Sequence, residues 1–110
     1  MDRPAAVVEG VLKEELARLQ SAEKSYLREI RRLPKGSLQK KRIKGIPYAY
    51  LVFRKEKVVI RKYLGRPSES ELKQLKGKIQ LRQKYEKLLR ALRRNQKRIS
   101  QMIYGYRRSS

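Results

Sequence analysis

The chain has 110 residues, of which 31 are Lys or Arg and only 10 are Asp or Glu, so its formal net charge is +21. It contains no Cys and no His, which removes disulfides, thiolate metal ligands and the usual general base of enzymes. No apolar run approaches the roughly 18–20 residues of a membrane span, and no signal-peptide pattern opens the chain, which favours a cytoplasmic location. We therefore expect no enzyme, no cofactor, no bound metal and no membrane association.

The positive charge is placed unevenly. Residues 1–33 hold 7 basic and 6 acidic side chains, whereas residues 34–110 hold 24 basic and 4 acidic ones. Such an excess works against a compact state through self-repulsion, and a polyphosphate relieves it with release of counterions. The charge predicts binding to nucleic acid, either DNA or RNA.

Residues 1–33 are predicted to form an N-terminal helical arm. Glu23 interrupts its apolar stripe, and Pro34 with Gly36 ends it. The near-neutral arm predicts protein contact, with a larger nucleoprotein complex or by self-association, because a hairpin within one chain and a two-chain bundle bury the same stripe. Its residues recur at sums of three and four: Leu12, Leu16, Leu19, Tyr26 and Ile30.

Residues 36–65 are rich in β-branched and aromatic residues, and Lys44–Gly45 and Lys55–Glu56 punctuate them. This pattern predicts a three-stranded antiparallel meander with two-residue turns at those two positions. In that register Tyr50 faces Arg61, and Leu51 faces Ile60.

The predicted register gives the sheet two different faces. In it Tyr48 lies opposite Tyr63. One predicted face is apolar and suits a covering helix: Leu38, Ala49, Leu51, Phe53, Val58 and Ile60. The other interleaves tyrosines with cations, which can stack on bases and hold phosphates, although plain cross-strand packing is the alternative. The nucleic-acid contacts predicted in this segment are Gln39, Lys41, Arg42, Lys44, Tyr48, Tyr50, Arg54, Arg61 and Tyr63.

Residues 68–104 are predicted to form a long helix that begins with a capping box of Ser68 and Glu71, and residues 105–110 a loose basic tail. Two apolar stripes lie on nearly opposite sides of this helix. The first is expected to pack on the sheet, and the second on the first helix or on another chain. The first stripe is Leu72, Leu75 and Ile79, and the second is Leu81, Tyr85, Leu88, Leu92, Ile99 and Met102.

The long helix also has a basic flank with one acid, Glu86, near it. An ordinary solvated helix face alternates the sign of its charges to form pairs, and this flank mostly does not. We expect it to contact the phosphate backbone without reading sequence, through Arg90, Arg93, Arg94, Lys97 and Arg98.

Part of the chain resembles known proteins. Lys44, Gly45, Tyr48, Tyr50, Leu51, Arg54, Tyr63, Leu64 and Gly65 fit a KG-x-x-Y-x-Y-L-x-x-R…YLG pattern followed by a charged helix. That pattern is similar to a set of short, uncharacterised basic proteins of bacteria and their mobile elements. The sheet segment also resembles the three-stranded arm-binding domain of tyrosine recombinases, without the recombinase catalytic domain. Both resemblances imply a module that docks on DNA or RNA without chemistry of its own.

The sequence as a whole predicts an α+β fold: N-terminal helix, three-stranded antiparallel β-meander, long C-terminal helix. The expected function is non-enzymatic nucleic-acid binding through the Tyr/Lys sheet face and the basic helix. The alternative is an accessory factor, an activator or inhibitor, that docks by its helices on a larger nucleoprotein enzyme such as a CRISPR effector or a transposon nuclease.

Overall fold

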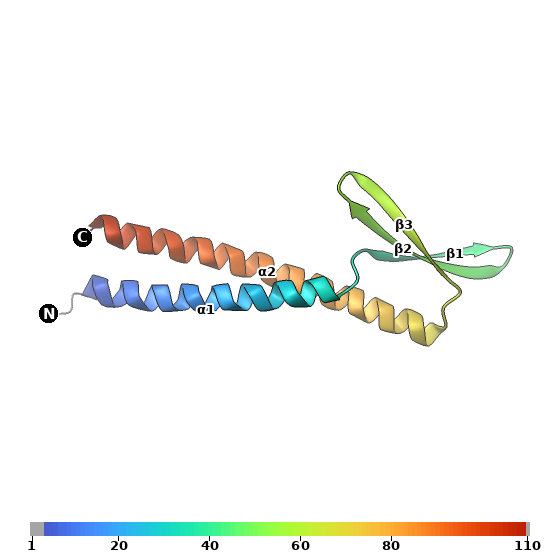
Figure 1. Ribbon diagram of the computed structural model, residues 1–110, viewed down its shortest axis with the longest axis horizontal. Helices are drawn as coiled ribbons and strands as arrows, with labels where there is room; N and C mark the ends of the chain where they lie inside the picture. The colour runs from blue at the N-terminus through green and yellow to red at the C-terminus, as the bar shows by residue number, and fades with distance from the viewer. Residues whose placement is uncertain (1–3, 110) are drawn as a thin grey trace. The chain divides into compact units, whose positions relative to one another are not determined.

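The computed structural model describes residues 4–109 and has the predicted α+β architecture (Figure 1). Residues 1–3 of the predicted arm and residue 110 of the predicted tail lie outside that range. The elements in chain order are α1 (Pro4–Arg32), β1 (Ser37–Ile43), β2 (Ile46–Lys55), β3 (Val58–Gly65) and α2 (Glu69–Ser109).

The chain divides into two compact units. The helical unit comprises the residues up to Glu29 and those from Tyr85 onward, and the sheet unit comprises Ile30–Lys84. The sheet unit therefore contains the three strands together with the first turns of α2.

In the helical unit α1 and α2 form an antiparallel hairpin. Glu9 near the start of α1 accepts a hydrogen bond from Nε of Arg107 near the end of α2, at 2.9 Å. Further along, the ring centroids of Tyr26 and Tyr85 lie 5.8 Å apart. The apolar stripe of the first helix thus has a partner within the same chain.

The stripe that α2 presents to this hairpin differs from the predicted one. Leu89, Leu92 and Ile103 are buried at 6–7% exposure, whereas Leu88 and Met102 are 39% and 52% exposed. Leu81, predicted in the same stripe, is 42% exposed, so the prediction was wrong for Leu81, Leu88 and Met102. Steps of three and four fit both the predicted and the buried series, so spacing alone did not distinguish Leu88 from Leu89 or Met102 from Ile103.

The sheet has strand order β1-β2-β3 and is antiparallel throughout. Its first hairpin confirms the predicted register, because Gln39 pairs with Tyr50 and Lys41 with Tyr48. The turn residues Lys44 and Gly45 have φ angles of 52° and 79°. Two successive left-handed residues are the geometry that matches the twist of a two-residue hairpin.

The second hairpin turns one residue later than predicted. Lys55 pairs with Val58, so the turn is Glu56–Lys57, and Tyr50 lies opposite Tyr63 rather than Arg61. The register prediction was wrong by two residues. Because side chains alternate with a period of two, this shift leaves every side chain on its predicted face.

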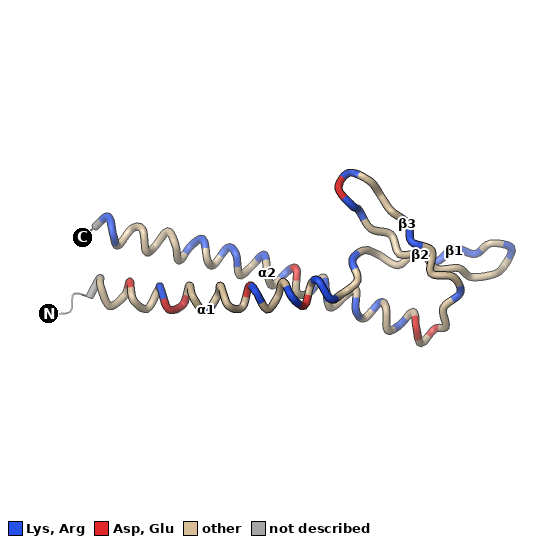
Figure 2. The backbone as a smooth tube through the Cα atoms, in the orientation of Figure 1, with Lys and Arg blue, Asp and Glu red and all other residues tan. Residues whose placement is uncertain are grey.

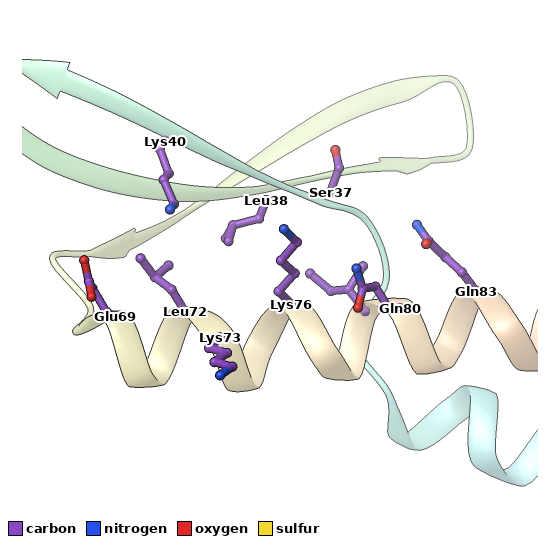
Figure 3. Close-up of a pocket in the computed structure, with 10 residues that line it drawn as sticks. Ser37, Leu38, Lys40, Glu69, Leu72, Lys73, Lys76, Gln80 and Gln83 are labelled. Carbon is purple, nitrogen blue, oxygen red and sulfur yellow. The ribbon is translucent and has the colours of Figure 1, made fainter.

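The start of α2 and the apolar face of the sheet bury their apolar residues. Ala49, Leu51 and Ile79 are 2%, 8% and 6% exposed, and Leu38 of β1 points toward α2 (Figure 3). Val58, directly after the turn, remains 62% exposed although it was expected to be covered.

Helix α2 begins and ends at identifiable contacts. Ser68 Oγ accepts a hydrogen bond from the backbone N–H of Glu71 at 3.2 Å, which is the predicted N-cap. At the other end the helix continues through Gly105 to Ser109, so the prediction that it ends near Tyr104 was wrong. An interior helical glycine costs only about 1 kcal/mol, and the Arg107–Glu9 contact holds the final turns.

The connection from α1 into the sheet is tightly fitted. Gly36 has φ 117°, and a Cβ at this position would lie 2.3 Å from the carbonyl oxygen of Val52. Next to it, Lys35 Nζ donates a hydrogen bond to the carbonyl oxygen of Arg54 at 3.1 Å. Only glycine fits this position without movement of β2.

Candidate nucleic-acid interface

Three tyrosines meet on the sheet face opposite the one that faces α2. The centroid of the Tyr63 ring lies 5.3 Å from that of Tyr50 and 6.1 Å from that of Tyr48, with interplanar angles of 49° and 40°. Lys41 places its ammonium 5.9 Å from the centroid of the Tyr50 ring. We call the surface formed by Lys41, Tyr48, Tyr50 and Tyr63 the tyrosine face.

The three rings are not equally accessible. Tyr48 and Tyr50 are half-buried, whereas Tyr63 is 56% exposed. Tilted ring contacts of this kind are favourable and fix side-chain orientation. Two rings therefore support the third, which presents much of its surface to solvent.

Cations and an amide flank the tyrosine face. Arg61 lies opposite Val52 and is exposed, and Gln39 pairs with Tyr50. Alternation along each strand puts both residues, and the exposed Arg54, on the same face as the tyrosines. The structure therefore brings these three predicted residues to the same face as the tyrosines.

Two predicted residues are placed differently from the rest. Arg42 pairs with Pro47 and alternates with Lys41, so it lies on the face of Leu38. Lys44 occupies the β1–β2 turn rather than either face.

The tyrosine face also carries apolar residues that were not among the predicted contacts. Val59, which pairs with Arg54, is 52% exposed, and Ile43 at the end of β1 is 48% exposed. Val59 lies two residues from Arg61, and Ile43 lies two residues from Lys41, so the strand period of two was a signal that could have identified them. The face is therefore partly apolar as well as aromatic and cationic.

The predicted basic flank belongs to the helical unit, whereas the tyrosine face belongs to the sheet unit. Figure 2 shows Lys and Arg along the later turns of α2, while α1 carries both signs of charge. Arg93 pairs with Glu23 at 2.9 Å. The other predicted cations are exposed and have no ion-pair partner among residues 4–109: Arg90, Arg94, Lys97 and Arg98.

The stripe predicted for protein docking is occupied inside the chain. Leu19 is 7% exposed, Tyr26 contacts Tyr85, and Leu12 and Leu16 are half-buried. Ile30, at 8% exposure, is buried in the sheet unit. A partner would have to open the hairpin to reach the stripe of the helical unit.

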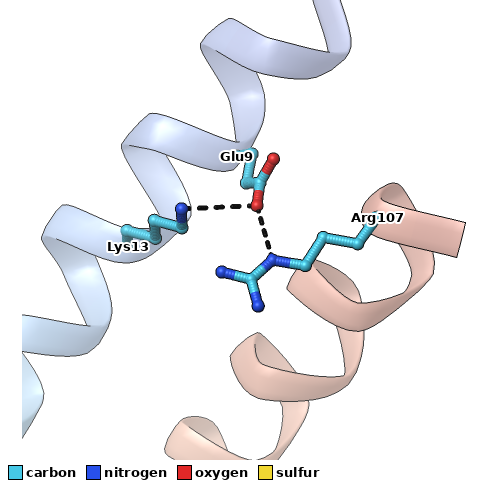
Figure 4. Close-up of polar contacts among 3 residues, drawn as sticks. All are labelled: Glu9, Lys13 and Arg107. Atoms are coloured by element: carbon cyan, nitrogen blue, oxygen red, sulfur yellow. Dashed lines mark hydrogen bonds and ion pairs between the residues drawn. The ribbon is translucent and has the colours of Figure 1, made fainter. Parts of the chain in front are cut away.

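Ion pairs along the hairpin lower the pKa of two of its carboxyl groups. The Arg107 guanidinium, together with Lys13 at 3.4 Å, holds the pKa of the Glu9 carboxyl below its ordinary value (Figure 4). The Arg18 guanidinium likewise lowers the pKa of Glu15, which in turn raises the pKa of Arg18. These carboxylates remain ionised at neutral pH and neutralise part of the cationic charge.

Within residues 4–109 no group of three or more acidic side chains is placed to hold a metal ion. Over the same span neither helix is long and apolar enough to cross a membrane.

The fold and the site together define an α+β protein with one sheet face turned to α2 and one face that carries exposed aromatic and cationic side chains. The chain belongs to the family described as Domain of unknown function (DUF6788), whose model matches residues 7–74. The match includes the whole sheet and the tyrosine face and ends before Arg90–Arg98. No curated protein and no solved structure matches the chain.

Proposed function

We propose that this protein binds DNA or RNA without catalysing a reaction, and that it does so in the cytoplasm, without a cofactor. The tyrosine face contacts bases, and the basic flank of α2 contacts the phosphate backbone.

The observation that carries the proposal is the cluster of Tyr48, Tyr50 and Tyr63 beside Lys41. A ring that is 56% exposed and held by two others is a ready platform for a base. Stacking of a base on such a ring contributes about 1–3 kcal/mol. The neighbouring ammonium and guanidinium groups supply phosphate contacts on the same face.

The structural alternative is that the tyrosines only stabilise the sheet. Their mutual ring contacts fit that role. However, Val59 and Ile43 add exposed apolar side chains near the two hairpin turns of the same face, and these can contact the apolar parts of a ligand. The combination of rings, aliphatic residues and cations favours a ligand that is both planar and anionic.

The basic flank supports the same proposal through charge. Arg90, Arg94, Lys97 and Arg98 lie within nine residues of one helix and lack acidic partners among the described residues. Each cation that neutralises a phosphate releases condensed counterions, so the affinity depends steeply on salt.

The second candidate function is an accessory factor that docks by its helices on a larger nucleoprotein enzyme. This candidate is weakened because Leu19 is buried and Tyr26 contacts Tyr85 within the same chain. The apolar stripe that docking would need is therefore already covered.

A titration against three ligands tests the proposal. Fluorescence anisotropy measures the binding of a labelled single-stranded DNA, its duplex and a structured RNA at about 50 and 200 mM salt. The proposal expects one ligand to bind at the higher salt, with an affinity that falls as salt rises. Absence of binding to all three ligands at both salt concentrations contradicts it and favours the accessory-factor candidate.

A further inference from the structure

A groove of about 680 Å³ lies in the sheet unit between β1 and the first turns of α2 (Figure 3). Its floor is aliphatic and formed by Leu38, Leu72 and Ile79. The groove opens on the side of the sheet opposite the tyrosine face, because Leu38 and Gln39 alternate along β1. It is therefore a surface distinct from the proposed nucleic-acid site.

Cations border the groove on both walls. Lys40 reaches it from β1 and Lys76 from α2, and Lys73 contributes to its lining. No hydrogen bond or ion pair joins these three lysines to a protein group within the described residues. Among the described residues that line the groove, Glu69 is the one acid. An anionic ligand would relieve the repulsion between the two walls.

The floor decides which anionic ligand fits. Bases are bound in proteins by stacking on aromatic rings, and none of the described residues that line this groove is aromatic. Aliphatic side chains on a helix or extended peptide are instead bound in aliphatic grooves, where anchor residues fill the floor. Gln80 and Gln83 on the α2 wall offer amide groups to a peptide backbone.

We propose that the groove between β1 and α2 binds an acidic segment of a partner protein that carries leucine-like anchors between its carboxylates. The anchors rest on Leu38, Leu72 and Ile79, and the carboxylates pair with Lys40 and Lys76. The charge of the groove is the opposite of the charge of its ligand, and this complementarity selects the ligand and speeds encounter.

The test uses a fluorescein-labelled 12-residue peptide in which Leu recurs at intervals of three and four among Glu residues. A second peptide has each Leu replaced by Asn, which leaves the charge unchanged. The full chain at about 150 mM salt should bind the first peptide at least about tenfold more tightly than the second. Equal binding of the two peptides, or no binding of the first, overturns the proposal.

Matched variants locate the site. Lys40→Gln with Lys76→Gln should weaken binding of the leucine peptide about tenfold. The control Lys55→Gln with Lys57→Gln removes the same charge next to the β2–β3 turn and should change it less than twofold. Equal effects of the two pairs overturn the proposal, since they indicate attraction to net charge alone. Amide shifts of ¹⁵N-labelled protein should cluster at Leu38 and Leu72 on addition of the peptide.

This inference does not depend on the nucleic-acid proposal. Tyr63→Ala should leave peptide binding unchanged, so a protein that binds peptide and no nucleic acid supports the groove and contradicts the proposed function. If Lys40→Gln with Lys76→Gln weakens nucleic-acid binding and the leucine peptide shows no preference, nucleic acid occupies the groove and the peptide proposal is wrong.

Discussion

Arg82 donates a hydrogen bond from Nη1 to the backbone carbonyl oxygen of Ile30 at 2.8 Å. The same nitrogen donates to the carbonyl oxygen of Leu33 at 2.7 Å. The last carbonyls of a helix have no partner within it, and a cation is favourable at that end of the helix dipole. Arg82 thus caps the C-terminus of α1 from within the sheet unit, although by sequence it is one of many cations on a basic helix.

Replacement of Arg82 by Met should lower the free energy of unfolding by about 2 kcal/mol, because a part-buried carbonyl loses a charged donor. Urea denaturation followed by circular dichroism measures the change. Arg90→Met is the matched control on an exposed position of the same helix and should change stability by less than about 0.5 kcal/mol. Equal effects of the two substitutions would show that Arg82 is not a cap.

The set of α2 residues that is buried in the hairpin gives a second prediction. Leu92→Ala should lower the free energy of unfolding by about 2–3 kcal/mol, since it removes a buried side chain from a packed site. Leu88→Ala, at 39% exposure, should cost less than about 1 kcal/mol. Thermal and urea unfolding of the two variants check this. A larger loss of stability in Leu88→Ala than in Leu92→Ala would contradict the exposure of Leu88 and favour the stripe predicted from the sequence.

Replacement of two glycines by alanine should have opposite effects on stability. Gly36→Ala should destabilise the protein by several kcal/mol, because φ 117° disfavours a side chain and its Cβ would meet the Val52 carbonyl oxygen. Gly77→Ala, in open space within α2, should stabilise by up to about 1 kcal/mol. Melting temperatures of both variants provide the comparison. A neutral Gly36→Ala would be incompatible with this close approach.

The Glu9 contacts predict a dependence on pH. A carboxyl whose pKa is lowered by folding stabilises the folded state above its unfolded pKa, about 4.3 for Glu. That contribution disappears as the pH falls through the lowered folded pKa. Urea unfolding of the wild type and Glu9→Gln between about pH 6 and pH 2 should therefore differ at the higher pH and converge in acid. A difference that is constant over this range contradicts the ion pair with Arg107.

Local signals in the sequence were sufficient for much of the fold. Gly45 marks the first hairpin turn, and Ser68 marks the start of α2, so both were predicted correctly. The second turn lies among Lys55, Glu56 and Lys57, where no Gly or Asn marks the left-handed position that Glu56 adopts. Its register depends on the pairing of whole strands, which no local pattern determines.

Features made by distant segments were not predictable in this way. The choice of Leu89 over Leu88 depends on where α1 lies beside α2, and the cap by Arg82 depends on where α1 ends. The groove joins Lys40 to Lys76 only after the sheet folds on α2. The tyrosine face was predictable because strand alternation places Tyr48 and Tyr50 on one face, and the two-residue error in register left Tyr63 on that face as well.

The most direct test of the nucleic-acid proposal compares two exposed tyrosines. Tyr63 belongs to the tyrosine face and is 56% exposed, whereas Tyr104 lies on α2 outside the proposed interface and is 63% exposed. Neither ring is part of the core, so both Tyr63→Ala and Tyr104→Ala should fold, which circular dichroism checks.

The measurement is the anisotropy of the preferred labelled nucleic acid at about 200 mM salt with the wild type and both variants. Loss of a base stacked on a ring corresponds to about 1–3 kcal/mol, so Tyr63→Ala should weaken binding about tenfold while Tyr104→Ala stays within twofold of the wild type. Wild-type affinity in the Tyr63→Ala variant would contradict base contact at the tyrosine face.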